Sequence, residues 1–189
     1  MCTVAPTPRA FLPSMPSPHR AATRGAMQSL DRILSFLDEI RLPVAEGPVP
    51  EHAFLPGVRI DGGAVVYDRA ALRWPGDLLH EAGHIAVTPS RLRPALNDGL
   101  DAVPAAAHAG EAEATAWAYA AVVHLRLEPS VLFHDGGYGG HSEGLIRSFA
   151  HGVNLGAHGL AQAGMTAIGT RAQHVGVAPY PRMLQWLRD

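Results

Sequence analysis

Residues 76–87 read GDLLHEAGHIAV and place two histidines four positions apart, with a glutamate directly after the first. On an α-helix, residues four apart project from the same face, so His80 and His84 can present imidazole nitrogens to one metal ion. Glu81 is rotated by about 100° from His80. Its carboxylate is therefore expected to miss the metal ion but to reach a water molecule bound to it. Two histidine ligands and a glutamate base are the arrangement of a zinc hydrolase.

Chance is the alternative explanation for this pattern, because the chain contains eleven histidines. From composition alone, the odds that such a pattern arises somewhere in the chain are roughly three in a hundred. Apolar residues on both sides of the histidines favour a buried helix and hence a real site. Asp77 or Asp68 could accept a hydrogen bond from a ligand imidazole.

A zinc site of this kind requires a third protein ligand, and residues 110–123, GEAEATAWAYAAVV, supply candidates. Glu111 heads a helical stripe of small residues (Ala114, Ala118 and Ala121) that would let this helix approach the histidine helix closely. Glu113 lies about 200° round the helix, so both carboxylates cannot face one ion. Glu111 is the preferred ligand, Glu113 remains an alternative, and a solvated first turn favoured by the helix dipole would explain either.

A glycine-rich loop at residues 133–144, FHDGGYGGHSEG, carries further candidates. A zinc peptidase needs a donor that stabilises the oxyanion formed on the substrate carbonyl, and Tyr138 or His141 could supply it. Glycines around Tyr138 would permit such a loop to move. An ordinary flexible polar loop is the simpler interpretation. His134, Asp135, His141 and Glu143 could also form a second metal site.

Hydrophobic periodicity and turn residues predict the elements that would hold these groups. They are a helix over 28–40 with Ser29 in its cap region, a hairpin over 58–67, a helix over 75–87, and a helix over 111–127. The Pro/Gly-rich stretch 43–57 is typical of a loop. Residues 145–165 are expected to be helical with glycine interruptions.

Composition restricts the class of protein. A chain of 189 residues with 47% hydrophobic residues can form one domain with a core. Its net charge of −2 gives no sign of direct nucleic-acid binding, and no apolar run is long enough for a membrane span. The single cysteine, Cys2, is compatible with a reducing interior, so a soluble cytoplasmic protein is expected. Residues 1–27 are Pro-rich and are expected to form a disordered tail.

The segments WPGDLLHEAGHIAV and EAEATAWAYAAVV together resemble the ImmA/IrrE family of zinc-dependent metallopeptidases. That family has a His-Glu-x-x-His helix followed by a helix of the form E-x-E-A-x-x-aromatic-A, matched here by Glu111, Glu113, Ala114, Trp117 and Ala118. An upstream hairpin is also similar, and the likeness covers about residues 55–130. Its register places the third ligand on Glu111. Thr115 departs from the Asn or Asp often found in the family.

This resemblance implies an α+β, zincin-like metallopeptidase domain over 28–130, with a glycine-rich loop and helical extension over 131–189. It implies a Zn²⁺ cofactor held by His80, His84 and Glu111, and a peptidase in which Glu81 acts as general base on a zinc-activated water. The activity would be either constitutive or latent. The substrate would be a protein or peptide. Cleavage of a transcriptional repressor is not carried over, because no helix-turn-helix pattern is present.

Two other functions remain open. One is a non-catalytic interaction protein that is stabilised by its metal. The other is a zinc hydrolase that acts on a non-peptide amide or ester. A structural metal site would normally have a fourth protein ligand, whereas a catalytic site leaves that position open.

Overall fold

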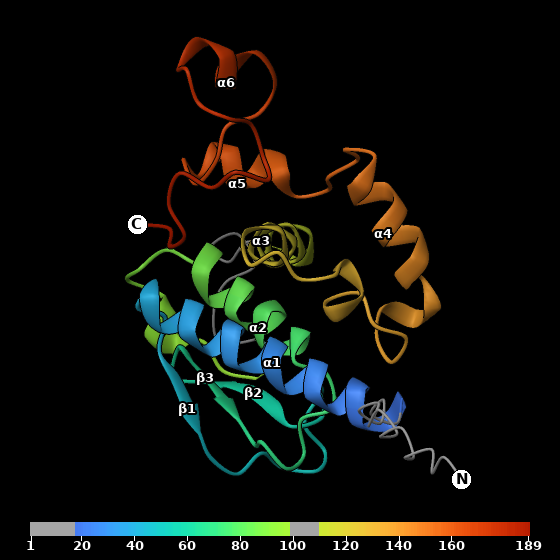
Figure 1. Cartoon of the computed structure of the whole chain (residues 1–189). Helices are drawn as coiled ribbons and strands as arrows, with labels where there is room; N and C mark the ends of the chain where they lie inside the picture. Colours follow the sequence, from blue (N-terminus) through green and yellow to red (C-terminus); the bar gives the residue numbers. More distant parts are fainter. Residues whose placement is uncertain (1–17, 99–109) are drawn as a thin grey trace, which may run out of the picture.

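The computed structural model describes residues 18–98 and 110–189 and has an α+β architecture (Figure 1). The order of its elements along the chain is α1 (Pro18–Glu39), β1 (Val44–Glu46), β2 (Val58–Asp61), β3 (Ala64–Tyr67), α2 (Gly76–Val87), η1 (Arg93–Ala95), α3 (Glu111–His124), η2 (Pro129–Val131), η3 (Tyr138–Gly140), α4 (Ser142–Ala150), α5 (Ala157–Gln162) and α6 (Gly169–His174).

The three strands form one mixed sheet in the order β1-β3-β2. The predicted hairpin is confirmed: β2 and β3 are antiparallel and are joined by Gly62 and Gly63. Both glycines have positive φ, 56° and 78°, as a two-residue hairpin turn of the favoured twist requires.

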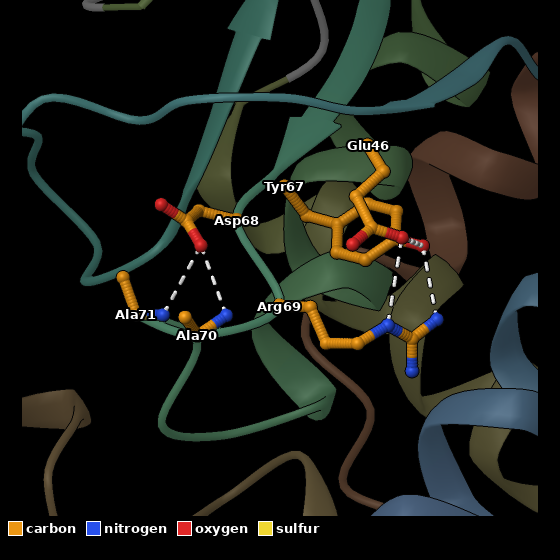
Figure 2. A network of polar contacts seen from close by, with 6 residues as sticks. All are labelled: Glu46, Tyr67, Asp68, Arg69, Ala70 and Ala71. Carbon is orange, nitrogen blue, oxygen red and sulfur yellow. Dashed lines mark hydrogen bonds and ion pairs between the residues drawn. The ribbon is translucent and has the colours of Figure 1, made fainter.

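Strand β1 corrects the expectation that residues 43–57 form only loop. It pairs in parallel with β3, and a polar network ties the two together (Figure 2). The Tyr67 hydroxyl donates to Glu46 at 3.0 Å, and Arg69 forms an ion pair with the same carboxylate at 3.5 Å. The strand is three residues long with Pro43 before it and Gly47 after it, so too few positions alternate to reveal a strand pattern.

Helix α1 contains the predicted amphipathic segment but begins earlier than expected. It starts at Pro18, whereas the sequence predicts a disordered tail through residue 27; residues 1–17 lie outside the described part. Proline is tolerated in the first helical turn, and the following alanines favour helix. Ser29 was expected near the cap, but it lies inside the helix and donates to the carbonyl of Gly25.

The core lies between the sheet and two successive helical layers. Figure 1 shows α1 and α2 over one face of the sheet, with α3 on the far side of α2. The buried strand residues Val58, Ile60, Val65 and Tyr67 belong to the same core cluster as the apolar residues of α1, α2 and α3. Helix α2 is therefore enclosed, and all but one of its residues are buried.

Parts of the C-terminal segment, η2 and α5, contact α3. The predicted helical stretch 145–165 is divided into α4 and α5, with positive φ at Gly152 and Gly156 between them. The chain end returns to the central helices, where the Trp117 indole donates to the carbonyl of Trp186 at 2.8 Å and the Arg188 amide donates to that of Ala86 at 2.9 Å. None of the helices in residues 18–98 and 110–189 combines the length and apolar character needed to cross a membrane.

Candidate metal centre

Helix α2 carries both histidines, and its sequence explains its limits. Pro75 occupies the N-cap, and Asp77 places a negative charge in the first turn, where the helix dipole favours it. The helix ends at Val87. Thr88 is extended because Pro89 disfavours helical geometry in the residue before it. The Thr88 hydroxyl donates to the carbonyl of His84 at 2.8 Å, which fixes the last turn.

Helices α2 and α3 approach closely at Gly83, inside the His-Glu-Ala-Gly-His segment. A Cβ built on Gly83 would lie 2.6 Å from the carbonyl oxygen of Ala114, which is far inside van der Waals contact. Ala114, Ala118 and Ala121 are fully buried, as the small-residue stripe predicts. The missing side chain at Gly83 and the short ones on α3 therefore bring the start of α3 to the histidines.

Three side chains converge at this approach. The Nε2 atoms of His80 and His84 are 3.3 Å apart. Glu111 places Oε2 3.4 Å from His80 Nε2 and Oε1 3.3 Å from His84 Nε2. This trio is the group within the described residues whose ligand atoms are arranged to hold a metal ion. Both imidazoles are largely enclosed, whereas the Glu111 side chain is 71% exposed.

These distances test the fit of the trio to a metal. Two ligands about 2.0–2.1 Å from a tetrahedral ion are separated by about 3.3 Å. The Nε2 atoms of His80 and His84 have this separation, and each lies at a similar distance from a different oxygen of Glu111. The three side chains are therefore close enough to share one metal ion.

The electrostatics of the trio match this geometry. Hydrogen bonds from His80 and His84 lower the pKa of Glu111 strongly and outweigh its partial burial. Burial lowers the pKa of His80, but the hydrogen bond to Glu111 and the charges of Glu81, Glu111 and Asp77 outweigh burial and raise it. The pocket thus favours positive charge between the imidazoles and the carboxylate, where a cation would sit.

Glu81 is buried and lines a cavity of about 230 Å³ beside the trio. Burial raises the pKa of this carboxyl, the two histidines lower it, and the charges of Asp98 and Glu111 raise it further. A carboxyl whose pKa is moved toward neutrality, adjacent to a metal-ligand set, is suited to taking and returning a proton. The structure thus puts Glu81 beside the cavity, and its role as a base on a metal-activated water stays a prediction.

The alternative ligand Glu113 points away from the trio. A Cβ built on Gly159 of α5 would lie 2.3 Å from Glu113 Oε1, so this side chain packs against α5. The choice of Glu111 over Glu113, made from the small-residue stripe, agrees with this placement.

Tyr138 lies next to the trio, at a ring-centroid distance of 6.2 Å from His80. It packs on Phe133 at 5.2 Å and adopts a φ of 54°, a left-handed conformation that is uncommon for a bulky residue. Burial, followed by the charges of Asp77, Glu111 and Glu81, raises its pKa, so the phenol stays protonated and can donate. Strained backbone of this kind often accompanies function.

His141 differs from Tyr138 in its placement. It is the exposed N-cap residue of α4. Among the described residues, no hydrogen bond joins it to His80, His84 or Glu111. A catalytic role for His141 stays a prediction without support from the geometry.

Asp77 and Asp68 were expected to orient a ligand imidazole, but both form hydrogen bonds with other groups. Asp77 Oδ1 pairs with His134 Nε2 at 2.8 Å, and the His134 ring stacks on Trp74 at a centroid distance of 4.3 Å. Asp77 therefore acts on His80 through its charge and not through a hydrogen bond. Asp68 accepts from the amides of Ala70 and Ala71 and stabilises its own turn (Figure 2).

The Asp77–His134 pair also bears on the second metal site. His134 is committed to Asp77, and no further group of three possible ligands converges within the described residues. The second site is not supported. The pair instead anchors the glycine-rich loop to the first turn of α2, one turn before His80.

Three residues that line the cavity were not singled out from the sequence: Phe54, Asn97 and Asp98. They come from segments that were expected to be loop. An Asn-Asp-Gly stretch signals a turn, but nothing in the sequence places that turn beside the histidines.

No protein-family model, curated protein or solved structure matches the chain. The functional assignment therefore depends on the site itself. Within the described residues, that site is a His-His-Glu group with the geometry to hold a metal ion, next to a buried glutamate and a cavity.

Proposed function

We propose that this protein is a zinc-dependent metallohydrolase, a peptidase of the zincin type similar to the ImmA/IrrE family. His80, His84 and Glu111 would hold the zinc ion. The observation that carries the proposal is the convergence of two imidazole nitrogens and one carboxylate, at 3.3–3.4 Å from one another, beside a cavity. Two imidazoles and one carboxylate are a typical ligand set of catalytic zinc.

Zinc held there would supply Lewis-acid chemistry, which activates water for attack near neutral pH and polarises a substrate carbonyl. Glu81 takes the proton from the attacking water and passes it to the leaving amine. Tyr138 is placed to donate a hydrogen bond to the oxyanion that develops on the carbonyl. The Asp77–His134 pair holds the loop that carries Tyr138 against α2.

An open coordination position separates this proposal from a metal that only stabilises the fold. A structural zinc normally has four protein ligands. The described residues bring three together, and the cavity lies on the side of Glu81. This arrangement supports catalysis. It does not distinguish a peptide bond from another amide or an ester, because the metal chemistry is shared.

The test is the Glu81→Gln variant. We expect it to bind one zinc per chain, as wild type does, and to lose about 10²–10⁴-fold in turnover, the usual contribution of a general base. Zinc is measured by elemental analysis and cleavage by mass spectrometry of a complex peptide mixture. Glu113→Gln is the matched control, because Glu113 faces α5. Wild-type turnover by Glu81→Gln would contradict the assignment.

A further inference from the structure

The cavity beside the metal ligands is also lined by residues that belong neither to the ligand trio nor to α2 and α3. Besides residues of α2 and α3, its lining includes Phe54, Ile60, Asn97 and Asp98. Phe54 is 88% exposed, so its side chain is available to a ligand. At about 230 Å³, the cavity is smaller than the pockets that enclose whole drug-sized ligands, about 300–1,000 Å³. It suits a single side chain.

Main-chain pairing with a substrate is blocked on this side. An extended peptide commonly binds by adding a strand to a free sheet edge. The outer edge of β2 is occupied, because the Asp98 amide donates to the carbonyl of Ile60 at 3.0 Å, and the amides of Ile60 and Gly62 donate to Asp98 and Asn97. Recognition at this wall must therefore use side-chain chemistry.

The contacts to β2 also fix the Asp98 carboxylate. Its Oδ1 accepts from the Ile60 amide at 3.4 Å, while the main-chain bond to Ile60 holds the backbone. Its negative charge acts on the Glu81 carboxyl across the cavity. Asp98 is exposed, and within the described residues its Oδ2 accepts no hydrogen bond, so this oxygen is available to a ligand.

The charge of the cavity lining determines which kind of substrate side chain it can bind. Glu81, Asp98 and Glu111 contribute three carboxyl groups to the lining, and no arginine lines it among the described residues. The chain contains no lysine. A divalent ion on the ligand trio leaves the wall at Asp98 negative, so it disfavours acidic groups. Of these three carboxyl groups, that of Glu81 belongs to a residue only 9% exposed.

We propose that Asp98 and Phe54 form a subsite for a cationic side chain, lysine or arginine, of the peptide that the zinc centre cleaves. The carboxylate pairs with the terminal charge, and the exposed ring packs on the alkyl stem and interacts with the cation. This inference rests on the proposed zinc site. The subsite specifies the class of substrate residue next to the scissile bond, which the ligand trio alone does not.

Two hydroxamates that differ only in a terminal charge test the subsite without relying on activity. Nα-acetyl-lysine hydroxamate and Nα-acetyl-norleucine hydroxamate both chelate zinc, and their binding to zinc-loaded protein is measured by calorimetry. We expect the lysine compound to bind about tenfold more tightly, from a partly exposed ion pair together with a cation–π contact. Equal affinities in wild type would overturn the subsite.

Asp98→Asn is the decisive variant, because an asparagine oxygen can still accept from the Ile60 amide while the charge is lost. We expect the preference for lysine to fall to about threefold, because only the cation–π contact with Phe54 remains, with affinity for the norleucine compound unchanged. Asp61→Asn is the control, since Asp61 pairs with Arg59 at 2.9 Å and does not line the cavity. An unchanged preference in Asp98→Asn contradicts the proposal.

The outcomes separate the subsite from the proposed function. If both hydroxamates bind equally well and Asp98→Asn has no effect, the subsite fails and the zinc centre stands. If zinc binds but neither hydroxamate does, the metal has no open position and the hydrolase proposal fails with the subsite.

Discussion

Gly83→Ala tests how the packing of α2 on α3 creates the metal centre. The added Cβ would lie 2.6 Å from the Ala114 carbonyl oxygen, and ordinary contact begins at 3.4 Å, so the helices must separate by about 0.8 Å. Metal–ligand distances in a working site hold within about 0.2 Å. Because Glu111 begins α3 only one turn before Ala114, this separation pulls the third ligand away from His80 and His84.

We expect Gly83→Ala to lower zinc affinity by about tenfold or more, since misplacing even groups that only support a ligand costs 10–100-fold. Its net cost in stability should be no more than about 2 kcal/mol. Overpacking costs about 1–3 kcal/mol, but alanine gains about 1 kcal/mol over glycine within a helix. Affinity is measured by competition with a chromophoric zinc chelator after metal removal, and stability by urea unfolding of the zinc-free protein.

Gly144→Ala is the matched control for this experiment. Gly144 lies within α4, and a Cβ there meets nothing within 4 Å. We expect it to leave zinc affinity unchanged and to stabilise the fold slightly. Wild-type zinc affinity in Gly83→Ala would refute the claim that close helix packing positions Glu111.

Further predictions concern individual side chains. Glu111→Gln should weaken zinc binding far more than Glu113→Gln does in the same chelator competition, and the reverse order would exclude Glu111 as the ligand. Tyr138→Phe should retain zinc and lower kcat by about 10²-fold, as expected for loss of an oxyanion donor; an unchanged kcat would remove Tyr138 from the mechanism. In zinc-free protein, the raised pKa of His80 gives stability that is present below about pH 6.5 and lost as pH rises through the folded-state value. The lowered pKa of Glu111 gives stability that is present above about pH 4.5 and lost as pH falls. Urea unfolding should therefore show a larger cost of Glu111→Gln at pH 5.5 than at pH 8.5, and an equal cost at both would contradict the ion pair.

Local periodicity in the sequence was sufficient to predict the elements that hold the ligands. The histidine helix, the glutamate helix and the hairpin have clear spacing signals, and the predicted convergence of His80, His84 and Glu111 follows from helical geometry and a stripe of alanines. The role of Gly83 in close packing is explained only by the structure, because it depends on which backbone lies opposite.

Contacts between distant segments could not be predicted in this way. Strand β1 is too short to show alternation, and its partner β3 lies about twenty residues further along the chain. The bond between Asp77 and His134 joins positions 57 residues apart, so helical spacing alone pointed to His80 as the neighbour of Asp77. Asp98 reaches the cavity only because its segment pairs with the edge of β2.

The most direct test is a crystal structure of the protein grown with zinc, in which the metal is located by its anomalous scattering. The account predicts one ion bonded to Nε2 of His80 and of His84 at about 2.0–2.1 Å and to a Glu111 oxygen at about 2.0–2.2 Å, with its fourth position open to the cavity lined by Glu81. A fourth protein ligand, or an ion bound away from these three residues, would contradict it.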